Sequence, residues 1–149
     1  MKRALVFSLV CVLGLNDFAR AQEHTPHTNY VLRCAGCHGM NGSGAPAAGI
    51  ADFNGMVGAF TGIDEGRTYL MHVPGVVGSG LSDSEIAAVM NYVMETWAGS
   101  SLPDPYVPFT ASEVGERRAI DIPDVVENRR EVAALLEALG IETADYPWP

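Results

Sequence analysis

The sequence has 149 residues, nine of them basic and 18 acidic, and its formal net charge at pH 7 is −9. A chain of this length fits one domain, or one domain with an extension. The acidic excess excludes a protein that binds nucleic acid or anionic lipid through a general positive charge. The composition therefore favours partners that are neutral, or basic where they dock.

The first 21 residues have the three-part pattern of a cleaved export signal. Lys2 and Arg3 precede an apolar run over residues 4–15, and the segment ends in the small-x-small triplet of residues 19–21. That run is too short for a membrane span, which needs about 20 apolar residues. We therefore expect a protein exported to the periplasm, with Gln22 as its first mature residue and no membrane span after cleavage.

Removal of this segment makes the chain more acidic and leaves it two cysteines. Three of the nine basic residues and one of the 18 acidic residues lie within residues 1–21, so the mature charge is −11 and no lysine remains. Cys11 leaves with the signal, whereas Cys34 and Cys37 stay. In an exported protein such thiols are usually consumed by a bond or a ligand.

The predicted elements of the mature chain are all helical. After a loose polar lead-in over residues 22–29, the patterns predict helices over residues 30–37, 64–72, 82–99, 110–118 and 124–139. Ser82 with Glu85, and Thr110 with Glu113, form capping boxes at two of the helix starts. A glycine-rich loop fills residues 39–55. Since no stretch alternates like a β-strand, we expect an all-α fold.

Prolines divide the chain near residue 100. The segment 100–110 holds three of them and is predicted to be an extended linker. The sequence thus predicts a main domain over residues 22–99 and an extension over residues 100–149 that carries the last two helices. Four arginines lie in this extension beside Glu113, Glu116, Glu127 and Glu131, and a solvated, salt-bridged surface is expected for them: Arg117, Arg118, Arg129 and Arg130.

The motif Cys34-Ala35-Gly36-Cys37-His38 indicates the chemistry. A redox disulfide of the thioredoxin type belongs in a β-α-β pattern, and no strand is predicted before Cys34. A tetrahedral zinc site needs a second pair of ligands. The remaining mature histidines, His24, His27 and His72, have no recognisable spacing for that. The third possibility is covalent attachment of c-type haem, for which C-x-x-C-H is the sequence motif.

Haem fits the spacing of these residues. Residues three and four apart share one face of a helix, so Cys34 and Cys37 can form thioethers with the two vinyl groups on one edge of the porphyrin. His38 can then turn its imidazole toward the iron. We therefore expect one covalent haem c on the two cysteines, with His38 as the proximal ligand of the iron.

Two segments resemble the small class I c-type cytochromes. "CAGCHGMNGSGAP" is similar to their haem-attachment segment and its glycine loop, and "LSDSEIAAVMNYVMETW" is similar to their C-terminal helix. The resemblance covers about residues 27–98. It implies cytochrome c-like helices around one haem, followed here by a C-terminal helical extension, and electron transfer rather than catalysis. It also implies that the carbonyl of Pro46 accepts a hydrogen bond from the ring of His38.

The sixth iron ligand of that family, a methionine followed by proline, has no counterpart in this sequence. Val73-Pro74 stands at the position, and valine cannot ligate iron. Met71 is the first candidate, because it would face the same way as Val73 if the segment is extended. His72 is the alternative, and it would give a lower potential than methionine. An open or water-filled position is the third possibility.

The expected function is that of a periplasmic electron carrier. We expect it to take electrons from a periplasmic dehydrogenase and to pass them towards a terminal oxidase or another cytochrome of a respiratory chain. The lysine-free surface argues against docking through a ring of lysines. Two alternatives stay open. One is a haem protein whose open or labile sixth position binds nitric oxide or carbon monoxide, or reduces peroxide. The other is a subunit held in a complex.

Overall fold

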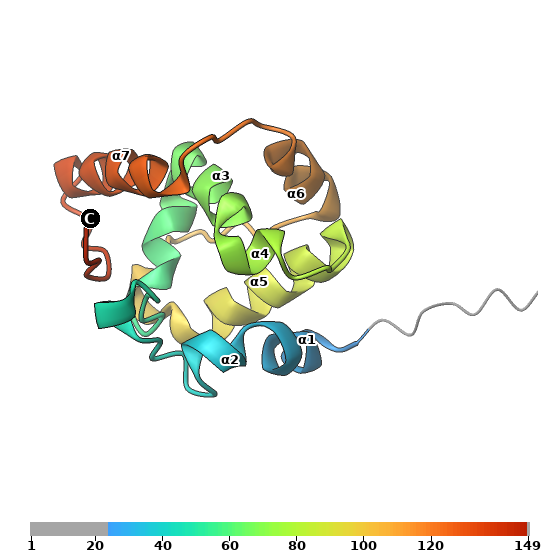
Figure 1. The fold of residues 1–149 in the computed structure, drawn as a ribbon. Coiled ribbons are helices and arrows are strands. Elements are labelled where there is room, and N and C mark those ends of the chain that lie inside the picture. The colour runs from blue at the N-terminus through green and yellow to red at the C-terminus, as the bar shows by residue number, and fades with distance from the viewer. Residues whose placement is uncertain (1–23, 149) are drawn as a thin grey trace, which may run out of the picture.

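The computed structural model describes residues 24–148, so the predicted export signal over residues 1–21 lies outside the described residues. This part of the chain is helical, as expected for the all-α class (Figure 1). The helices are α1 (Pro26–Arg33), α2 (Ala35–His38), α3 (Asp64–His72), α4 (Pro74–Val77), α5 (Asp83–Trp97), α6 (Ala111–Arg118) and α7 (Val125–Ala138). Three 3-10 turns join them: η1 (Pro46–Ala48), η2 (Val57–Gly62) and η3 (Gly99–Ser101).

The helix starts follow their capping residues. At α5 the Ser82 hydroxyl accepts from the backbone N–H of Glu85, and the Glu85 carboxylate accepts from the backbone N–H of Ser82, so this capping box is confirmed. At α6 only half of the predicted box forms. The hydroxyl of Thr110 caps the N–H of Glu113 at 3.2 Å, while the carboxylate of Glu113 is bound to arginines instead.

The first helix begins earlier than predicted. Thr25 caps it and Pro26 occupies its first turn, where a missing N–H costs nothing. The prediction of a loose, non-helical lead-in over residues 22–29 is therefore wrong from residue 26 onward. The hydroxyl of Thr25 accepts from the N–H of Thr28 at 3.2 Å, which is the local signal that fixes the start.

Helix α1 packs against α5 (Figure 1), and an aromatic cluster joins the two helices. The rings of Tyr30 and Trp97 lie 4.5 Å apart between their centroids, and Tyr92 meets both. Gly42 has φ +75° and lies against the indole, where a Cβ would be 2.9 Å from Cγ of Trp97. The loop after α2 can therefore approach α5 this closely only because position 42 carries no side chain.

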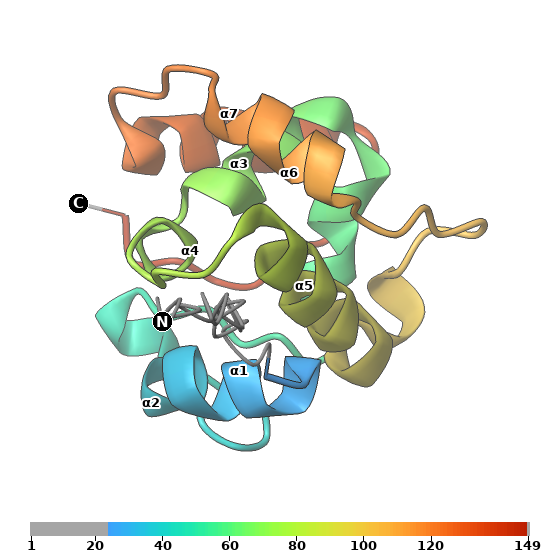
Figure 2. The ribbon, with the colours of Figure 1, turned by 90° about the vertical axis from the view of Figure 1, so that its right-hand side faces the viewer.

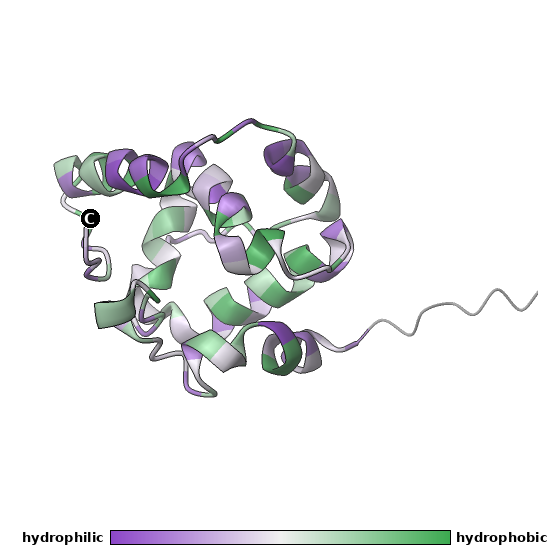
Figure 3. Ribbon diagram, viewed as in Figure 1, coloured by the Kyte–Doolittle hydropathy of each residue, from purple (hydrophilic) through white to green (hydrophobic). Residues whose placement is uncertain are grey.

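The C-terminal extension packs on the same core. α6 contacts α3 and α5, and α7 contacts α3 and η2 on the side opposite α1 and α2 (Figure 2). Val114, Val132 and Leu136 are fully buried by these contacts. Polar and apolar residues alternate around α7, so one face of it lies inward (Figure 3). Within residues 24–148 no helix is long and apolar enough to cross a bilayer.

Candidate functional site

The cysteines and the histidine of the C-x-x-C-H motif lie on one helical turn. Cys34 ends α1 and opens α2, and its carbonyl accepts from the N–H groups of Cys37 at 3.1 Å and His38 at 2.9 Å. Cys34 is half-buried and Cys37 is exposed, and both are free thiols. Burial raises the pKa of the Cys34 thiol, and so does the neighbouring Cys37. The three residues therefore share one helical turn, as the sequence pattern predicted.

His38 is held through one ring nitrogen. Its Nδ1 lies 3.1 Å from the carbonyl oxygen of Ala51, so we assign the proton to Nδ1, which donates to that oxygen. The imidazole also stacks on the ring of Phe53, with centroids 3.9 Å apart and planes 18° from parallel. Burial lowers the pKa of His38, partly offset by the bond to Ala51. The arrangement favours a neutral imidazole with Nε2 left for a metal ion.

The acceptor of this bond differs from the expected one. Pro46 was predicted to accept from His38, but its carbonyl takes the N–H of Gly49 at 2.9 Å within η1. The loop then turns back through the isolated bridge between Ala45 and Ile50, which brings the next carbonyl, that of Ala51, under the histidine. The prediction of a backbone carbonyl was correct in kind and wrong in position.

Gly44 makes this turn possible. Its φ is +59°, and a Cβ at this position would overlap the carbonyl oxygens of Ile50 and Ala51. A side chain at residue 44 would therefore push away the carbonyl that holds His38. Because residue 44 is glycine, the loop can turn back and keep the carbonyl oxygen of Ala51 beside His38.

His27 and His72 have partners of their own. His27 packs against the ring of Tyr92 in the aromatic cluster, with centroids 5.8 Å apart. His72, at the end of α3, is turned toward the loop after α6. Within residues 24–148, no three His, Cys, Asp or Glu side chains come together as a metal site of their own.

The candidates for the sixth ligand have other contacts. Met71 and His72 belong to α3, so the extended segment that would align Met71 with Val73 is not present; only Val73 is extended. The side chain of Met71 is fully buried in the core. Nδ1 of His72 lies 2.8 Å from the carbonyl of Thr68, and Nε2 lies 2.9 Å from the carbonyl of Ile120. Both ring nitrogens of His72 thus lie against backbone carbonyl oxygens.

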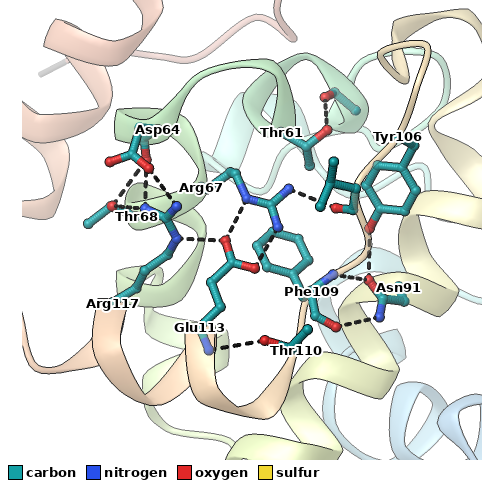
Figure 4. Close-up of polar contacts among 12 residues, drawn as sticks. Thr61, Asp64, Arg67, Thr68, Asn91, Tyr106, Phe109, Thr110, Glu113 and Arg117 are labelled. Carbon is teal, nitrogen blue, oxygen red and sulfur yellow. Dashed lines mark hydrogen bonds and ion pairs between the residues drawn. The ribbon is translucent and has the colours of Figure 1, made fainter.

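Polar contacts tie the extension to the main domain (Figure 4). Arg67 on α3 donates from Nε and Nη2 to the carboxylate of Glu113 on α6, and Arg117 donates to the same carboxylate. Arg117 also donates to Asp64 at 2.6 Å. Hydrogen bonds from Arg117 and Arg67 lower the pKa of Asp64 and Glu113, respectively. These charged bonds hold α6 against α3.

A second anchor holds the linker before α6. The amide of Asn91 on α5 donates to the carbonyl of Phe109 at 2.9 Å, and its oxygen accepts from Phe109 N–H and from the Tyr106 hydroxyl, each at 2.8 Å (Figure 4). Both the nitrogen and the oxygen of this one side chain therefore bind the linker. The proline-rich segment is pinned along α5 instead of running free.

The four arginines of the extension do not share one environment. Three pair with carboxylates: Arg117 with Glu113 and Asp64, Arg118 with Asp83, and Arg130 with Glu127. Arg129 is different, because it is 3% exposed and lies in the core. The predicted solvated surface is therefore wrong for Arg129, whose place on the inward face of α7 the charge pattern did not reveal.

Comparisons with known proteins connect this site to a family. No protein-family model matches the chain. A cytochrome c-552 of Thermus thermophilus is 34% identical over 137 residues, which cover 80% of this chain and 88% of that relative. A second protein of that name and species is 35% identical over 105 residues, covering 58% and 79%. The chain belongs to the class I c-type cytochromes.

As a member of this family, the cytochrome is an electron-transfer protein that works with haem c. The match to the first relative also extends the resemblance seen in the sequence. Residues 22–99 make up only about half of the 149 residues, so similarity over 80% of the chain reaches beyond them. The family likeness is therefore not limited to the segments around the C-x-x-C-H motif and α5.

Proposed function

We propose that the cytochrome carries one haem c, bound by thioethers to Cys34 and Cys37 and ligated at the iron by Nε2 of His38. The supporting observation is the attachment turn itself. Two free thiols and a histidine whose Nδ1 is already bonded lie within five residues on one helical turn. These are the donor groups that covalent haem requires, in the protonation state in which the histidine can bind iron.

Each residue of the turn has its own task in this proposal. When bound, haem supplies an iron centre that takes up and releases one electron. Cys34 and Cys37 hold the group so that it does not dissociate. The carbonyl of Ala51 and the ring of Phe53 fix the direction of the His38 imidazole. Because Ala51 is kept in place by Gly44, the glycine loop acts on the iron through His38.

The proposal includes the place and partners of the cytochrome. It works in the periplasm after cleavage of residues 1–21, between a periplasmic dehydrogenase as donor and a terminal oxidase or another cytochrome as acceptor. Residues 22–99 form the haem domain, and residues 100–149 form the linker and extension. The mature formal charge of −11 favours docking on neutral or basic surfaces, with attraction that weakens as salt rises.

The test is to produce the full chain, with its leader, in bacteria that express a haem-attachment system. The purified protein should begin at Gln22, and its mass after denaturation should exceed that of the polypeptide by one haem. Cys34→Ala and Cys37→Ala should each lose one thioether, and the double variant should carry no covalent haem. A wild-type protein with no covalent haem under these conditions would overturn the proposal.

A second candidate function is binding of a small gaseous ligand at the iron. The contacts of His72 and Met71, the two residues that the sequence offered as the sixth ligand, favour this function. His72 has both ring nitrogens against carbonyl oxygens, and Met71 is enclosed by protein on the helix α3. If neither reaches the iron, the sixth position is open to nitric oxide or carbon monoxide.

Carbon monoxide distinguishes the two functions. Added to the reduced, undenatured cytochrome, it should change the visible spectrum if the sixth position is open or labile. In the ferric protein, an absorption band from sulfur bound to iron would instead establish a methionine ligand. That band together with an unchanged spectrum under carbon monoxide would exclude ligand binding and leave electron transfer alone.

A further inference from the structure

A series of aromatic rings leads away from the proximal histidine. The imidazole of His38 stacks on Phe53, with ring centroids 3.9 Å apart. The centroid of Phe53 lies 6.2 Å from that of Trp97, which lies 5.6 Å from that of Tyr92. The last two steps are within the range of about 4.5–7 Å that is typical of rings in contact. Phe53, Trp97 and Tyr92 thus form an aromatic path from the attachment turn to α5.

Backbone hydrogen bonds fix the spacing of this path. The N–H of Phe53 donates to the carbonyl of Gly42 at 2.8 Å, and the N–H of Gly55 donates to the carbonyl of Trp97 at 2.8 Å. Gly42 also lies directly against the indole of Trp97. The loop that carries Phe53 is therefore tied both to the loop after α2 and to the end of α5, so the fold itself holds the rings in series.

The aromatic path ends near the surface. Trp97 and Tyr92 are half-buried, and the exposed residue His27 meets Tyr92 with ring centroids 5.8 Å apart. Within residues 24–148, the tyrosine hydroxyls that make hydrogen bonds are those of Tyr30, Tyr69 and Tyr106, and Tyr92 is not among them. The hydroxyl of Tyr92 is therefore not committed to another group of the described chain.

Tyr30 belongs to the same aromatic cluster but differs in one chemical respect. It is fully buried, and its hydroxyl donates to the carbonyl of Gly39 at 2.6 Å. Burial raises the pKa of Tyr30 to about 12. A phenol is readily oxidised only if its proton can leave, and a backbone carbonyl does not take that proton up. The half-buried Tyr92 is thus a better end of the path than Tyr30.

We propose that the aromatic path delivers an electron to the iron centre when peroxide oxidises it, so that Tyr92 bears the oxidation in place of the haem. The inference rests on the proposed function, because it requires haem on Cys34 and Cys37, and it requires a sixth position that peroxide can reach. Hydrogen peroxide takes up two electrons and two protons and leaves as two molecules of water. Ferric iron gives one electron, and Tyr92 gives the other through Trp97 and Phe53.

The protons and the return of both electrons complete the balance. The two protons that peroxide takes up come from water, and the hydroxyl of Tyr92 releases one proton to water as it loses its electron. A small phenol or thiol then gives a hydrogen atom to the oxygen of Tyr92. The electron donor of the cytochrome reduces the iron centre back to the ferric state. Neither the polypeptide nor the haem is consumed in this cycle.

The chemistry of the three rings suits this role. Indoles and phenols lose one electron more readily than other neutral side chains, so Trp97 can be oxidised in passing, whereas Phe53 serves as the packed contact between His38 and Trp97. Electron tunnelling weakens steeply with distance, so several short steps are faster than a single long one. The oxidation thereby leaves the iron before it reaches Met71 and Met94, buried side chains whose conversion to sulfoxide would disrupt the core.

Electron paramagnetic resonance of the complete cytochrome tests the path. Peroxide is mixed with the ferric protein, and samples are frozen after short times. The wild type should give a tyrosyl radical whose spectrum narrows with ring-deuterated tyrosine, and peptide mapping by mass should place the oxidised ring at Tyr92. Tyr92→Phe should shift the radical to Trp97. The double variant Tyr92→Phe with Trp97→Phe should form neither radical, and its haem should bleach several-fold faster.

The chain offers a matched control for each variant. Trp148→Phe is the control for Trp97→Phe, because Trp148 is the other tryptophan of the chain and packs on Tyr146 in the C-terminal segment. Tyr30→Phe is the control for Tyr92→Phe, because both tyrosines lie in the same cluster. Both controls should keep the radical and the bleaching rate of the wild type. The haem spectrum and the urea midpoint show whether each variant is folded.

Three results would overturn the inference while leaving the proposed function in place. The first is a wild-type protein with covalent haem, established by mass, that neither bleaches nor forms a radical with peroxide. The second is a radical mapped to Tyr69, Tyr106 or Tyr146. The third is a folded double variant that bleaches at the wild-type rate. Absence of covalent haem would overturn the inference together with the proposed function.

Discussion

Arg67 on α3 and Glu113 on α6 form a bidentate ion pair. Nε and Nη2 of Arg67 lie 2.6 and 2.7 Å from the two carboxylate oxygens of Glu113. Arg117 donates a further bond to the same carboxylate at 2.8 Å. The guanidinium of Arg67 also lies over the ring of Phe109, 4.1 Å from its centroid. One carboxylate therefore serves two arginines and locks the extension to the domain that carries the attachment turn.

Removing the charge of Glu113 should destabilise the protein. Glu113→Gln leaves the buried Arg67 without a counterion, so the free energy of unfolding should fall by about 2–4 kcal/mol. Urea titration with linear extrapolation measures this loss. Glu116→Gln is the control, because Glu116 is exposed on the same helix and, among residues 24–148, bonds only to Ser112. Its effect should stay within about 0.5 kcal/mol. Equal losses for the two variants would contradict the role given to Glu113.

The same network predicts how stability depends on acid. The pKa values of Asp64 and Glu113 are lowered in the folded state by hydrogen bonds from Arg117 and Arg67. A lowered pKa means that the stabilisation is complete above the unfolded values, about pH 4, and is lost as the pH falls through the folded values. Unfolding free energies of the wild type should therefore drop below about pH 4. The drop should be smaller in Glu113→Gln, and parallel curves would refute the assignment.

The glycine loop should tolerate no side chain beside the carbonyl that holds His38. Gly44→Ala places a methyl group onto the carbonyl oxygens of Ile50 and Ala51 and keeps φ positive. We expect the unfolding free energy to fall by about 2–4 kcal/mol, with less haem attached per polypeptide. Gly55→Ala is the matched control, because Gly55 has φ +69° and open space around it. It should lose only about 1 kcal/mol, so similar losses would contradict the overlap argument.

A variant of Met71 separates the two candidate functions. If the enclosed Met71 is a core residue, Met71→Leu should leave the ferric spectrum unchanged and cost less than about 1.5 kcal/mol, since the change conserves volume. Met90→Leu, at another buried position on α5, is the control. Loss of a sulfur–iron absorption band in Met71→Leu alone would identify Met71 as the sixth ligand and exclude the ligand-binding function.

The helices were the most predictable part of this protein because their signals are local. The start of α5 is set by the hydrogen bonds between Ser82 and Glu85, which lie three residues apart. Helix α3 ends before Pro74, as the pattern predicted. The acceptor of the His38 bond was not predictable in the same way. Its position depends on three successive glycines with positive φ, Gly42, Gly44 and Gly49, and spacing does not encode that path.

The burial of Arg129 has a signal in the sequence of α7. Residues 125, 129, 132 and 136 repeat at helical spacing, so the arginine lies on the apolar face of α7. That pattern marks a buried charge. It does not say which groups face the charge, because Phe60 and Tyr69 lie some 60–70 residues earlier in the chain. Tertiary contacts of this range are beyond any reading of a single helix.

The contact between Tyr146 and Gly49 joins the attachment loop to a segment about 100 residues later in the chain. The loop whose carbonyl holds His38 therefore reaches its final surroundings only after the segment that follows α7 has packed. An enzyme that attaches haem to the unfolded chain meets the turn before this contact exists. Attachment of the cofactor and packing of this distant segment are thereby two separate steps of maturation.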